Sequence, residues 1–252
     1  MKKTFSPKKS AFSLIELSIV LIVIGLLVAG VTGGASLIKS SELRSVMSEA
    51  RGYSVAVSGF FSQFNALPGD FSTSLGTPAN GATALTGGTG DNDDTIDYCN
   101  SCSSTAGTLT GSESTIAWYH LKQSGAVDSV ITYASAGTAQ AAQTNFPASK
   151  IKAAGWVFDY NTTSEQNVVV LTGSLAAAAS GATPVNAGTA TALAAGVITP
   201  ADGLSVDSKI DDGVANTGKV RGIGSKCSSS GTYTVTSGDK DCALSYQIDV
   251  NS

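Results

Sequence analysis

Histidine and charged residues are scarce in this 252-residue chain. Only 13% of its residues are Asp, Glu, Lys or Arg, and the single histidine is His120. One histidine excludes a multi-histidine metal centre, and no serine or cysteine nucleophile can be tied to it as a catalytic triad. We interpret His120, beside Trp118 and Tyr119, as a core or interface residue. The formal net charge of −4 argues against nucleic acid as the main partner, because phosphate binding needs clustered Lys and Arg.

The composition predicts a loop-rich chain that still forms a hydrophobic core. Hydrophobic residues make up 42% of it, although long tracts consist mostly of Ala, Ser, Thr and Gly. That apolar fraction is too high for a wholly disordered chain. Basic residues without acidic ones mark the first eleven positions, and the remainder is acidic. These basic residues are Lys2, Lys3, Lys8 and Lys9. A basic segment on an acidic chain indicates a separate, temporary role for that segment.

A long apolar run follows the basic segment. It reads FSLIELSIVLIVIGLLVAGVTGGASLI from Phe12 to Ile38 and contains one charged residue, Glu16. A helix of this length spans ~40 Å and can cross the ~30 Å hydrocarbon core of a bilayer. The preceding lysines favour a cytoplasmic N-terminus, with everything after Ile38 on the outer side. In a secretory signal peptide the small residue follows the apolar region, whereas Ala11 precedes it here. This order predicts cleavage between Ala11 and Phe12, with the helix retained.

Glu16 needs a partner if its helix lies in a membrane. A carboxylate at depth in the bilayer costs about 2.5–3.5 kcal/mol or more. Cleavage after Ala11 would create an α-amine at Phe12, four residues before Glu16. In a bundle, the amine of one copy could pair with Glu16 of its neighbour, which would neutralise both charges and fix the axial stagger. The alternative is an ordinary signal anchor whose Glu16 reaches the lipid headgroups.

The segment KKSAFSLIELSIVLIVIGLL resembles the leader and start of a type IV pilin or a type II secretion pseudopilin. The shared features are a short basic leader, a small residue, Phe at the cut and Glu at the fifth mature position. The resemblance implies that a prepilin peptidase cleaves after Ala11 and methylates the amine of Phe12, and that Glu16 guides docking into a filament. Ala11 stands where glycine is usual, and Gly33-Gly34 stands where many pilins have proline. A glycine pair can also loosen a helix.

An amphipathic segment continues the apolar run. Its apolar residues recur every three or four positions until Asn65 and the sequence Leu67-Pro68-Gly69-Asp70 end the helix. We expect one continuous helix from Phe12 to about Phe64, in preference to a membrane helix followed by a separate soluble helix. The apolar face of its second half consists of Leu43, Val46, Met47, Ala50, Tyr53, Val57, Phe60, Phe61 and Phe64.

The expected fold is α+β and pilin-like, with the long helix packed on an antiparallel β-sheet head that carries loop insertions. We divide the chain into a cleaved leader (1–11), a transmembrane or filament-core helix (12–38), an amphipathic continuation (39–66) and a head (67–252). Strands are predicted at Trp156–Tyr160, Asn167–Leu171, Thr232–Thr236 and Leu244–Val250. Short helices are predicted at Ser114–Gln123 and from a Thr199 cap to about Ile210. The Ala-, Thr-, Ser- and Gly-rich stretch from 172 to 197 is interpreted as an exposed excursion.

Three short segments of the head also resemble parts of larger pilin-like proteins. They are LPGDF (67–71), KIDDG (209–213) and TGKV (217–220). This resemblance favours one pilin head over an enzyme fused to a pilin-like anchor.

The four cysteines are expected to form disulfides because the chain is predicted to be exported. Of the three pairings that four cysteines allow, we favour Cys227–Cys242 and Cys99–Cys102. The first pair would join the last two predicted strands, much as a C-terminal disulfide loop does in many type IV pilins, and closing a loop of about 15 residues stabilises a fold by ~3 kcal/mol. Cys99-Asn-Ser-Cys102 also has the spacing of a redox or zinc pair, but no βαβ pattern surrounds it.

An acidic loop is the candidate metal site. Asp91, Asp93, Asp94 and Asp97 lie close together in the sequence, and alternating Asp residues on a tight loop can converge on Ca²⁺. The loop lacks the Gly and the final Glu of a full EF-hand loop, so a solvated acidic turn is the alternative. No cofactor is required, and a structural calcium ion is the candidate. A second cluster, Asp207, Asp211 and Asp212, is interpreted as a helix end and turn.

These features predict a structural subunit of a type IV pilus or a type II secretion pseudopilus and not an enzyme. Residues 12–252 are long for a major subunit, which favours a minor or specialised one. The expected partners are prepilin peptidase, other pilin or pseudopilin subunits, and the inner-membrane assembly platform. We expect a precursor in the bacterial inner membrane with its head in the periplasm, and later a subunit in a pilus or pseudopilus. The alternative is a membrane-anchored extracytoplasmic enzyme or binding protein whose anchor only mimics a pilin.

Overall fold

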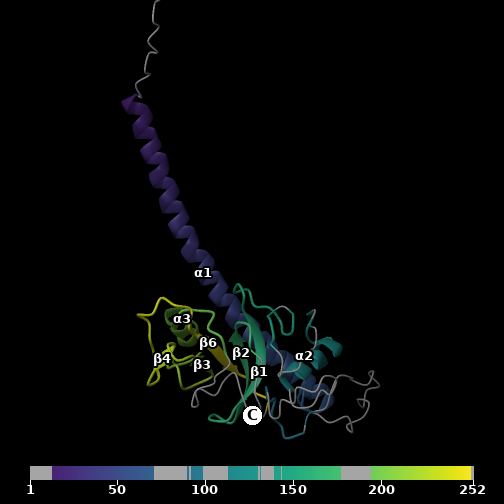
Figure 1. Cartoon of the computed structure of the whole chain (residues 1–252). Helices are drawn as coiled ribbons and strands as arrows, with labels where there is room; N and C mark the ends of the chain where they lie inside the picture. Colours follow the sequence, from purple (N-terminus) through teal and green to yellow (C-terminus); the bar gives the residue numbers. More distant parts are fainter. Residues whose placement is uncertain are drawn as a thin grey trace, which may run out of the picture. The chain divides into compact units, whose positions relative to one another are not determined.

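The computed structural model describes residues 13–70, 90, 92–98, 113–129, 131, 139–142, 144–176 and 194–250. The chain divides into two compact units, Met1–Glu42 and Leu43–Ser252. Figure 1 shows the elements of both units. In chain order they are α1 (Leu14–Phe64), α2 (Glu113–Gln123), β1 (Gly155–Asn161), β2 (Gln166–Thr172), α3 (Pro200–Ile210), β3 (Val220–Ile223), β4 (Ser228–Ser229), β5 (Thr232–Tyr233) and β6 (Ala243–Gln247).

Helix α1 is one continuous element of 51 residues, as predicted. It ends where expected, because Asn65 takes a left-handed conformation (φ 55°) while its N–H still donates to the carbonyl of Phe61. In the second unit, α1 buries the predicted apolar face. Leu43, Val46, Ala50, Val57 and Phe60 are buried, and Met47, Tyr53, Phe61 and Phe64 are half-buried against the same core.

A four-stranded antiparallel sheet in the order β1-β2-β6-β3 forms the centre of the second unit. The predicted hairpin is confirmed and extends one residue further at each end of both strands. Its cross-strand pairs include Trp156 with Leu171 and Phe158 with Val169. Six of the seven residues in each of these strands are buried, so both faces of the hairpin are covered. Strands covered on both faces read as apolar runs without clear alternation, as β2 does.

Helix α2 joins α1 to the sheet through aromatic side chains. Trp118 of α2 lies edge-on to Tyr53 of α1, with ring centroids 4.9 Å apart, and stacks on Phe158 of β1 at 4.2 Å. Such pairs add about 0.5–1.5 kcal/mol each beyond the area that they bury. The helix starts at Glu113, one residue before the predicted start, and Gly125 follows its end with a φ of +76°. These contacts place α2 beside the turn that follows α1.

Both edge strands of the sheet are covered by other parts of the chain. On the outer side of β1, the Phe158 N–H donates to the hydroxyl of Ser114 at 3.0 Å. On the outer side of β3, the Gly222 N–H donates to the carbonyl of Ala215 at 2.8 Å. An edge whose N–H groups are occupied does not readily add a strand from another chain. Strand addition at these edges is therefore a poor route to assembly.

The predicted Cys227–Cys242 disulfide is confirmed, with Cα atoms 4.7 Å apart. It joins the loop after β3 to the residue before β6, and so encloses the β4–β5 hairpin. The predicted strand Thr232–Thr236 is wrong in length, because β5 ends at Tyr233. After Tyr233 the Val235 N–H donates to the carbonyl of Tyr233 and the Ser237 N–H donates to the carbonyl of Thr234, which turns the chain away from an extended path. Strand β3 was not predicted, since four residues with a central glycine give no periodic signal.

Helix α3 begins with the predicted capping box. The Thr199 hydroxyl accepts from the Asp202 N–H, the Asp202 carboxylate accepts from the Thr199 N–H, and Pro200 occupies the first turn. The excursion predicted for 172–197 is only partly described, because 177–193 lie outside the described residues. Its two ends are not exposed: Leu175 is 2% and Val197 is 7% exposed.

Glu49 holds the second half of α1 against the rest of the head, and sequence analysis did not single it out. Its carboxylate accepts three hydrogen bonds: from Trp156 Nε1 at 2.8 Å, from the Ser149 hydroxyl at 2.6 Å and from the Lys150 N–H at 3.0 Å. Hydrogen bonds to a charged group are stronger than those between neutral groups. Removing this acceptor leaves the indole N–H of the buried Trp156 without a partner.

Glu49→Ala is expected to lower the free energy of unfolding by about 2–3 kcal/mol, because a buried donor loses its acceptor. The measurement is denaturant unfolding of the full-length protein in detergent, followed by fluorescence of the two tryptophans. Glu42→Ala is the matched control, since Glu42 lies on the same helix and is exposed. Equal unfolding free energies for the two variants would contradict this role of Glu49.

Candidate functional site

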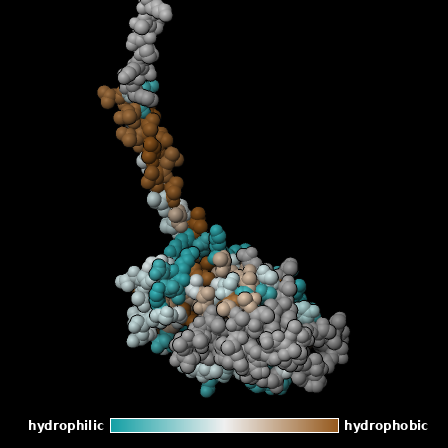
Figure 2. Space-filling view, in the orientation of Figure 1, coloured by the Kyte–Doolittle hydropathy of each residue, from teal (hydrophilic) through white to brown (hydrophobic). Residues whose placement is uncertain are grey.

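The first half of α1 presents apolar side chains on every side. All fifteen large apolar residues from Leu14 to Ile38 are at least 48% exposed within the described structure. Figure 2 shows this stretch as an almost continuous hydrophobic surface. By length and composition, α1 is the one described helix that could cross a membrane. So large an apolar surface requires lipid or other apolar helices around it.

Glu16 caps the start of this helix. One of its carboxylate oxygens, Oε2, accepts a hydrogen bond from the Ser13 N–H at 2.9 Å. The Ser13 hydroxyl in turn accepts from the Ile15 N–H at 3.4 Å. Ser13 is thus the N-cap residue and Glu16 the third helical residue, which is the arrangement of a capping box. A negative charge at this end of a helix is also favoured by the helix dipole.

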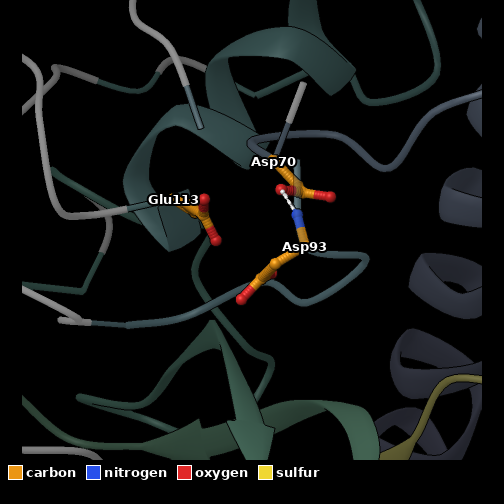
Figure 3. A group of neighbouring side chains, drawn as sticks. All are labelled: Asp70, Asp93 and Glu113. Atoms are coloured by element: carbon orange, nitrogen blue, oxygen red, sulfur yellow. Dashed lines mark hydrogen bonds between the residues drawn. The ribbon is translucent and has the colours of Figure 1, made fainter. Parts of the chain in front are cut away.

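A second site candidate lies in the head, where three carboxylates meet. Ligand oxygens of Asp70, Asp93 and Glu113 lie within 4.8 Å of one another. Figure 3 shows them converging from the turn after α1, a loop and the first residue of α2. Asp70 and Glu113 are 2% and 5% exposed, whereas Asp93 is exposed. The Asp70 carboxylate accepts the N–H groups of Asp93 at 3.1 Å and Asp94 at 2.9 Å.

The turn that carries Asp70 is held tightly against α2. Gly69 has a φ of +95°, and a Cβ on it would lie 2.4 Å from the carbonyl oxygen of Glu113, so only glycine fits. Its N–H donates to Nδ1 of His120 at 3.0 Å. His120 is fully buried and stacks on Phe60, which confirms its interpretation as a core residue. Burial lowers the pKa of His120 to about 4, so the ring is neutral at pH 7 and accepts this bond.

Burial also sets the ionisation of Asp70. Burial and, to a smaller extent, the charge of Asp93 raise the pKa of this carboxyl to about 6, while hydrogen bonds from backbone N–H groups oppose the rise. At neutral pH the Asp70 carboxyl is therefore ionised, although its buried surroundings favour the protonated form. A divalent cation or a bound proton would each relieve this cost. Carboxylate oxygens are the ligands that Ca²⁺ prefers.

The second acidic cluster has a structural explanation. Asp207 is fully buried and accepts from the Tyr233 hydroxyl at 2.9 Å, while Asp212 accepts from the Thr217 hydroxyl at 2.7 Å. Asp211 accepts from the backbone N–H groups at the start of β3. Burial raises the pKa of Asp207, and the bond from Tyr233 opposes that rise. The three residues form a helix end and turn, as interpreted from the sequence.

An apolar recess lies between α1, α3 and the sheet of the head. Its lining includes Val46, Met47, Val206, Ile210 and Leu244. No charged side chain contributes to this lining. The recess therefore provides mainly apolar packing surface, to which Ser245 and Tyr246 add two hydroxyl-bearing side chains.

A match to a known family identifies the type of N-terminal segment. The prokaryotic N-terminal methylation motif matches residues 6–32. These residues form a prepilin-type leader and its helix start. No curated protein and no solved structure matches the chain.

The prepilin-type leader fits the architecture that follows it. A long helix with an exposed apolar stretch precedes a four-stranded antiparallel sheet, an α+β layout consistent with the pilin fold. The leader and the apolar helix indicate a membrane-anchored, pilin- or pseudopilin-like protein with a structural role. The motif implies processing by a prepilin peptidase and assembly with other pilin subunits.

The structure places only some of the predicted site residues. Glu16 lies at the helix start, as expected, while Ala11 and Phe12 lie outside the described residues, as do Cys99 and Cys102. Of the predicted calcium ligands, Asp93 belongs to the group of three carboxylates, whereas Asp94 and Asp97 do not and Asp91 lies outside the described residues.

Sequence analysis missed Asp70 and Glu113, which lie about twenty residues from the acidic loop on either side. The LPGD sequence around Asp70 was noted as a resemblance, and it was the available signal. Calcium binding stays a prediction.

His120→Asn is expected to remove one contribution to the pH dependence of stability between pH 4 and 7. Unfolded chains bind a proton at histidine near pH 6.5, whereas the folded protein does so only near pH 4. The contribution of His120 therefore lowers the stability of the wild type as the pH falls through this window, by at most about 3 kcal/mol. Asparagine can accept the Gly69 bond and does not titrate. Unfolding free energies at pH 4.5 and 7 test this, and an unchanged pH dependence in the variant would contradict it.

Asp70→Asn is expected to change the pH dependence in the opposite sense. The folded protein binds a proton at Asp70 up to about pH 6, whereas the unfolded chain releases it near pH 3.8. Measured in EDTA, the contribution of Asp70 therefore lowers the stability of the wild type as the pH rises from 4 to 7, and the variant lacks this contribution. The test is the difference in unfolding free energy between the two proteins at each pH. A difference that does not vary with pH would overturn this prediction.

The predicted calcium site is tested with the same pair of proteins. Millimolar Ca²⁺ at pH 7 is expected to raise the Tm of the wild type over its value in EDTA, because an ion that binds only the folded state stabilises it. The Asp70→Asn variant should respond less, since its site has lost a charged ligand. Identical Tm values of the wild type in Ca²⁺ and EDTA would exclude such a site.

Proposed function

We propose that this protein is a minor or specialised structural subunit, a pilin or pseudopilin, of a type IV pilus or a type II secretion pseudopilus. The observation that carries the proposal is the placement of Glu16. It is the single charge at the start of a helix that is apolar on all sides, and it lies within a prepilin-type methylation motif. This combination suits a helix that moves from lipid into a bundle of similar helices.

Assembly begins with processing of the leader in this account. Prepilin peptidase cleaves after Ala11 and methylates the new amine of Phe12, while α1 anchors the precursor in the inner membrane and the head lies in the periplasm. The amine then pairs with Glu16 of a neighbouring subunit. Both charges are neutralised in apolar surroundings, where either alone would cost several kcal/mol.

The charge pair fixes the axial register between neighbouring helices, because apolar packing alone cannot fix it. Lipid tails are as apolar as Leu and Ile, so the hydrophobic effect gives little reason for one helix to leave lipid for another. Van der Waals packing tolerates sliding between two similar apolar surfaces. One carboxylate paired with one amine has a single satisfied alignment. Glu16 is therefore the residue that selects the stagger between neighbouring subunits.

The head supplies the surface of the assembled subunit in this proposal. Its sheet edges are covered, which supports growth of the filament through α1 and not through strand addition. The inner-membrane assembly platform is the expected machinery that lifts the subunit out of the bilayer.

Glu16→Ala is expected to reduce incorporation into filaments by at least tenfold, which corresponds to about 1.4 kcal/mol. Membrane insertion should be unchanged, because alanine is better tolerated in the bilayer than glutamate. The measurement is the ratio of subunit in sheared filaments to subunit in membranes, by quantitative mass spectrometry. Glu42→Ala, an exposed glutamate of the same helix, is the control and should behave as wild type. Normal incorporation of Glu16→Ala into filaments would contradict the proposed role of Glu16 in docking.

A further inference from the structure

The half of α1 that packs on the head keeps one face open. Its buried residues lie on one side of the helix, and the opposite side is exposed from Arg44 to Ser62. At the centre of that side Val55 is 71% exposed, and a Cβ on Gly59 would meet no atom within 4 Å. We call this side the arginine face. It consists of Arg44, Ser48, Arg51, Val55, Gly59 and Ser62.

Two arginines on this face have no carboxylate partner. Arg44 and Arg51 are both exposed and lie seven residues apart, which places them on the same side of the helix. Within the described part of the chain, neither guanidinium makes an ion pair or a side-chain hydrogen bond. The head that carries them is acidic, because residues 43–252 contain seventeen acidic and ten basic residues. Two unpaired positive charges on such a head suit an acidic binding partner.

Exposed carboxylates gather where the acidic loop meets the turn between β1 and β2. The Asn167 side chain, at the start of β2, donates to the carbonyl of Asp94 at 3.1 Å and accepts the Ile96 N–H at 2.8 Å. Glu165 lies in the turn two residues before Asn167, and its side chain is exposed, as is that of Asp94. We call this region the acidic end of the head. It consists of Asp93, Asp94, Asp97 and Glu165.

The arginine face begins far from the acidic end. Helix α1 rises ~30 Å from Arg44 to its last residue, Phe64. The turn that follows carries Asp70, whose carboxylate accepts the N–H of Asp94 at 2.9 Å. One end of the head thus presents free positive charge and the other end negative charge. Two copies can pair these ends only head to tail, and a head-to-tail contact that repeats without closing builds a helical filament.

We propose that the arginine face binds the acidic end of a second copy of this chain in the filament. This inference rests on the proposed function, because it assigns the contact between heads in the same assembly. Each exposed ion pair contributes only about 0.2–1 kcal/mol, so the contact gives direction and specificity more than affinity. Two arginine faces, or two acidic ends, repel each other. The small side chains around Val55 allow a neighbouring head to approach the helix closely.

The contact is tested by charge reversal at both surfaces. Arg44→Glu/Arg51→Glu is expected to lower incorporation into sheared filaments at least tenfold, because repulsion replaces attraction. Asp94→Lys/Glu165→Lys should lower incorporation of the otherwise wild-type chain about threefold, yet raise that of the arginine-reversed chain at least threefold. The measurement is the ratio of subunit in filaments to subunit in membranes, by quantitative mass spectrometry. Asp94 and Glu165 are chosen because neither belongs to the candidate calcium group.

The change of sign distinguishes a contact from damage to the head. Lysines that merely destabilise the fold lower incorporation in both backgrounds, whereas lysines at the contact lower it in one and raise it in the other. Lys209→Glu/Lys240→Glu is the matched control, since both lysines are exposed and lie outside the two surfaces. This control is expected to incorporate as the wild type does.

Direction is tested by cross-linking between copies. Ser48 lies between the two arginines and Thr163 lies in the β1–β2 turn, and both are exposed. In filaments, Ser48→Cys/Thr163→Cys is expected to give a ladder of covalent oligomers on a non-reducing gel, because each copy joins one neighbour at each end. Either single variant is expected to give no oligomer larger than a dimer.

The outcomes separate this inference from the proposed function. If the wild type enters filaments and Arg44→Glu/Arg51→Glu does so equally well, the arginine face is not an interface while the pilin function stands. If the lysines fail to raise incorporation of the arginine-reversed chain, the acidic partner is not a second copy, and the proposal is overturned. Dimers without a ladder would overturn it too, because the surfaces would then pair like with like. If the wild type itself never enters filaments, the proposed function fails, and this inference with it.

Discussion

A single carboxylate in an otherwise apolar helix is the constraint on which the account depends. The surface of α1 from Leu14 to Ile38 can lie in lipid or against other helices with little difference in free energy, so it does not specify an arrangement. Glu16 does specify one, because a charge in those surroundings must be paired. In the proposed assembly, its partner is the amine that cleavage after Ala11 would create on a neighbouring subunit. In the structure, one oxygen of the Glu16 carboxylate accepts the backbone N–H of Ser13 at the start of α1.

The head follows a different principle, in which carboxylates hold backbone and side-chain donors in place. Glu49 joins α1 to the β1 hairpin through three donors, and Asp207 and Asp211 close the turn between α3 and β3. Asp70 and Glu113 order the loop beside α2 in the same way. In this chain with few charged residues, half-buried and buried carboxylates thus form several of the hydrogen bonds that join segments far apart in the sequence. The Cys227–Cys242 disulfide adds a covalent closure at the end of the sheet.

Local sequence patterns predicted the main helices and the first hairpin, whereas contacts between residues far apart in the sequence were not predicted. The full length of α1, the β1–β2 hairpin and the Thr199 cap of α3 follow from periodicity and capping chemistry, which act over a few residues. Strand β3 is too short and glycine-containing to give a pattern, and its pairing with β6 depends on tertiary contacts. Glu49 and Asp70 look like ordinary polar residues, because their donors lie about 25 to 107 positions away. The Ser13–Glu16 contact has a local sequence signature, a Ser three residues before a Glu ahead of an apolar run, but the sequence analysis did not single it out.

The central claim is that the leader is removed and α1 kept, so that an amine at Phe12 becomes available to Glu16. The most direct measurement is the intact mass and N-terminal residue of the protein purified from its native membrane. The account predicts a chain that starts at N-methylated phenylalanine, at position 12. A chain that still starts at Met1 would contradict it, because Glu16 would then have no amine to meet and α1 would be an ordinary anchor for the head.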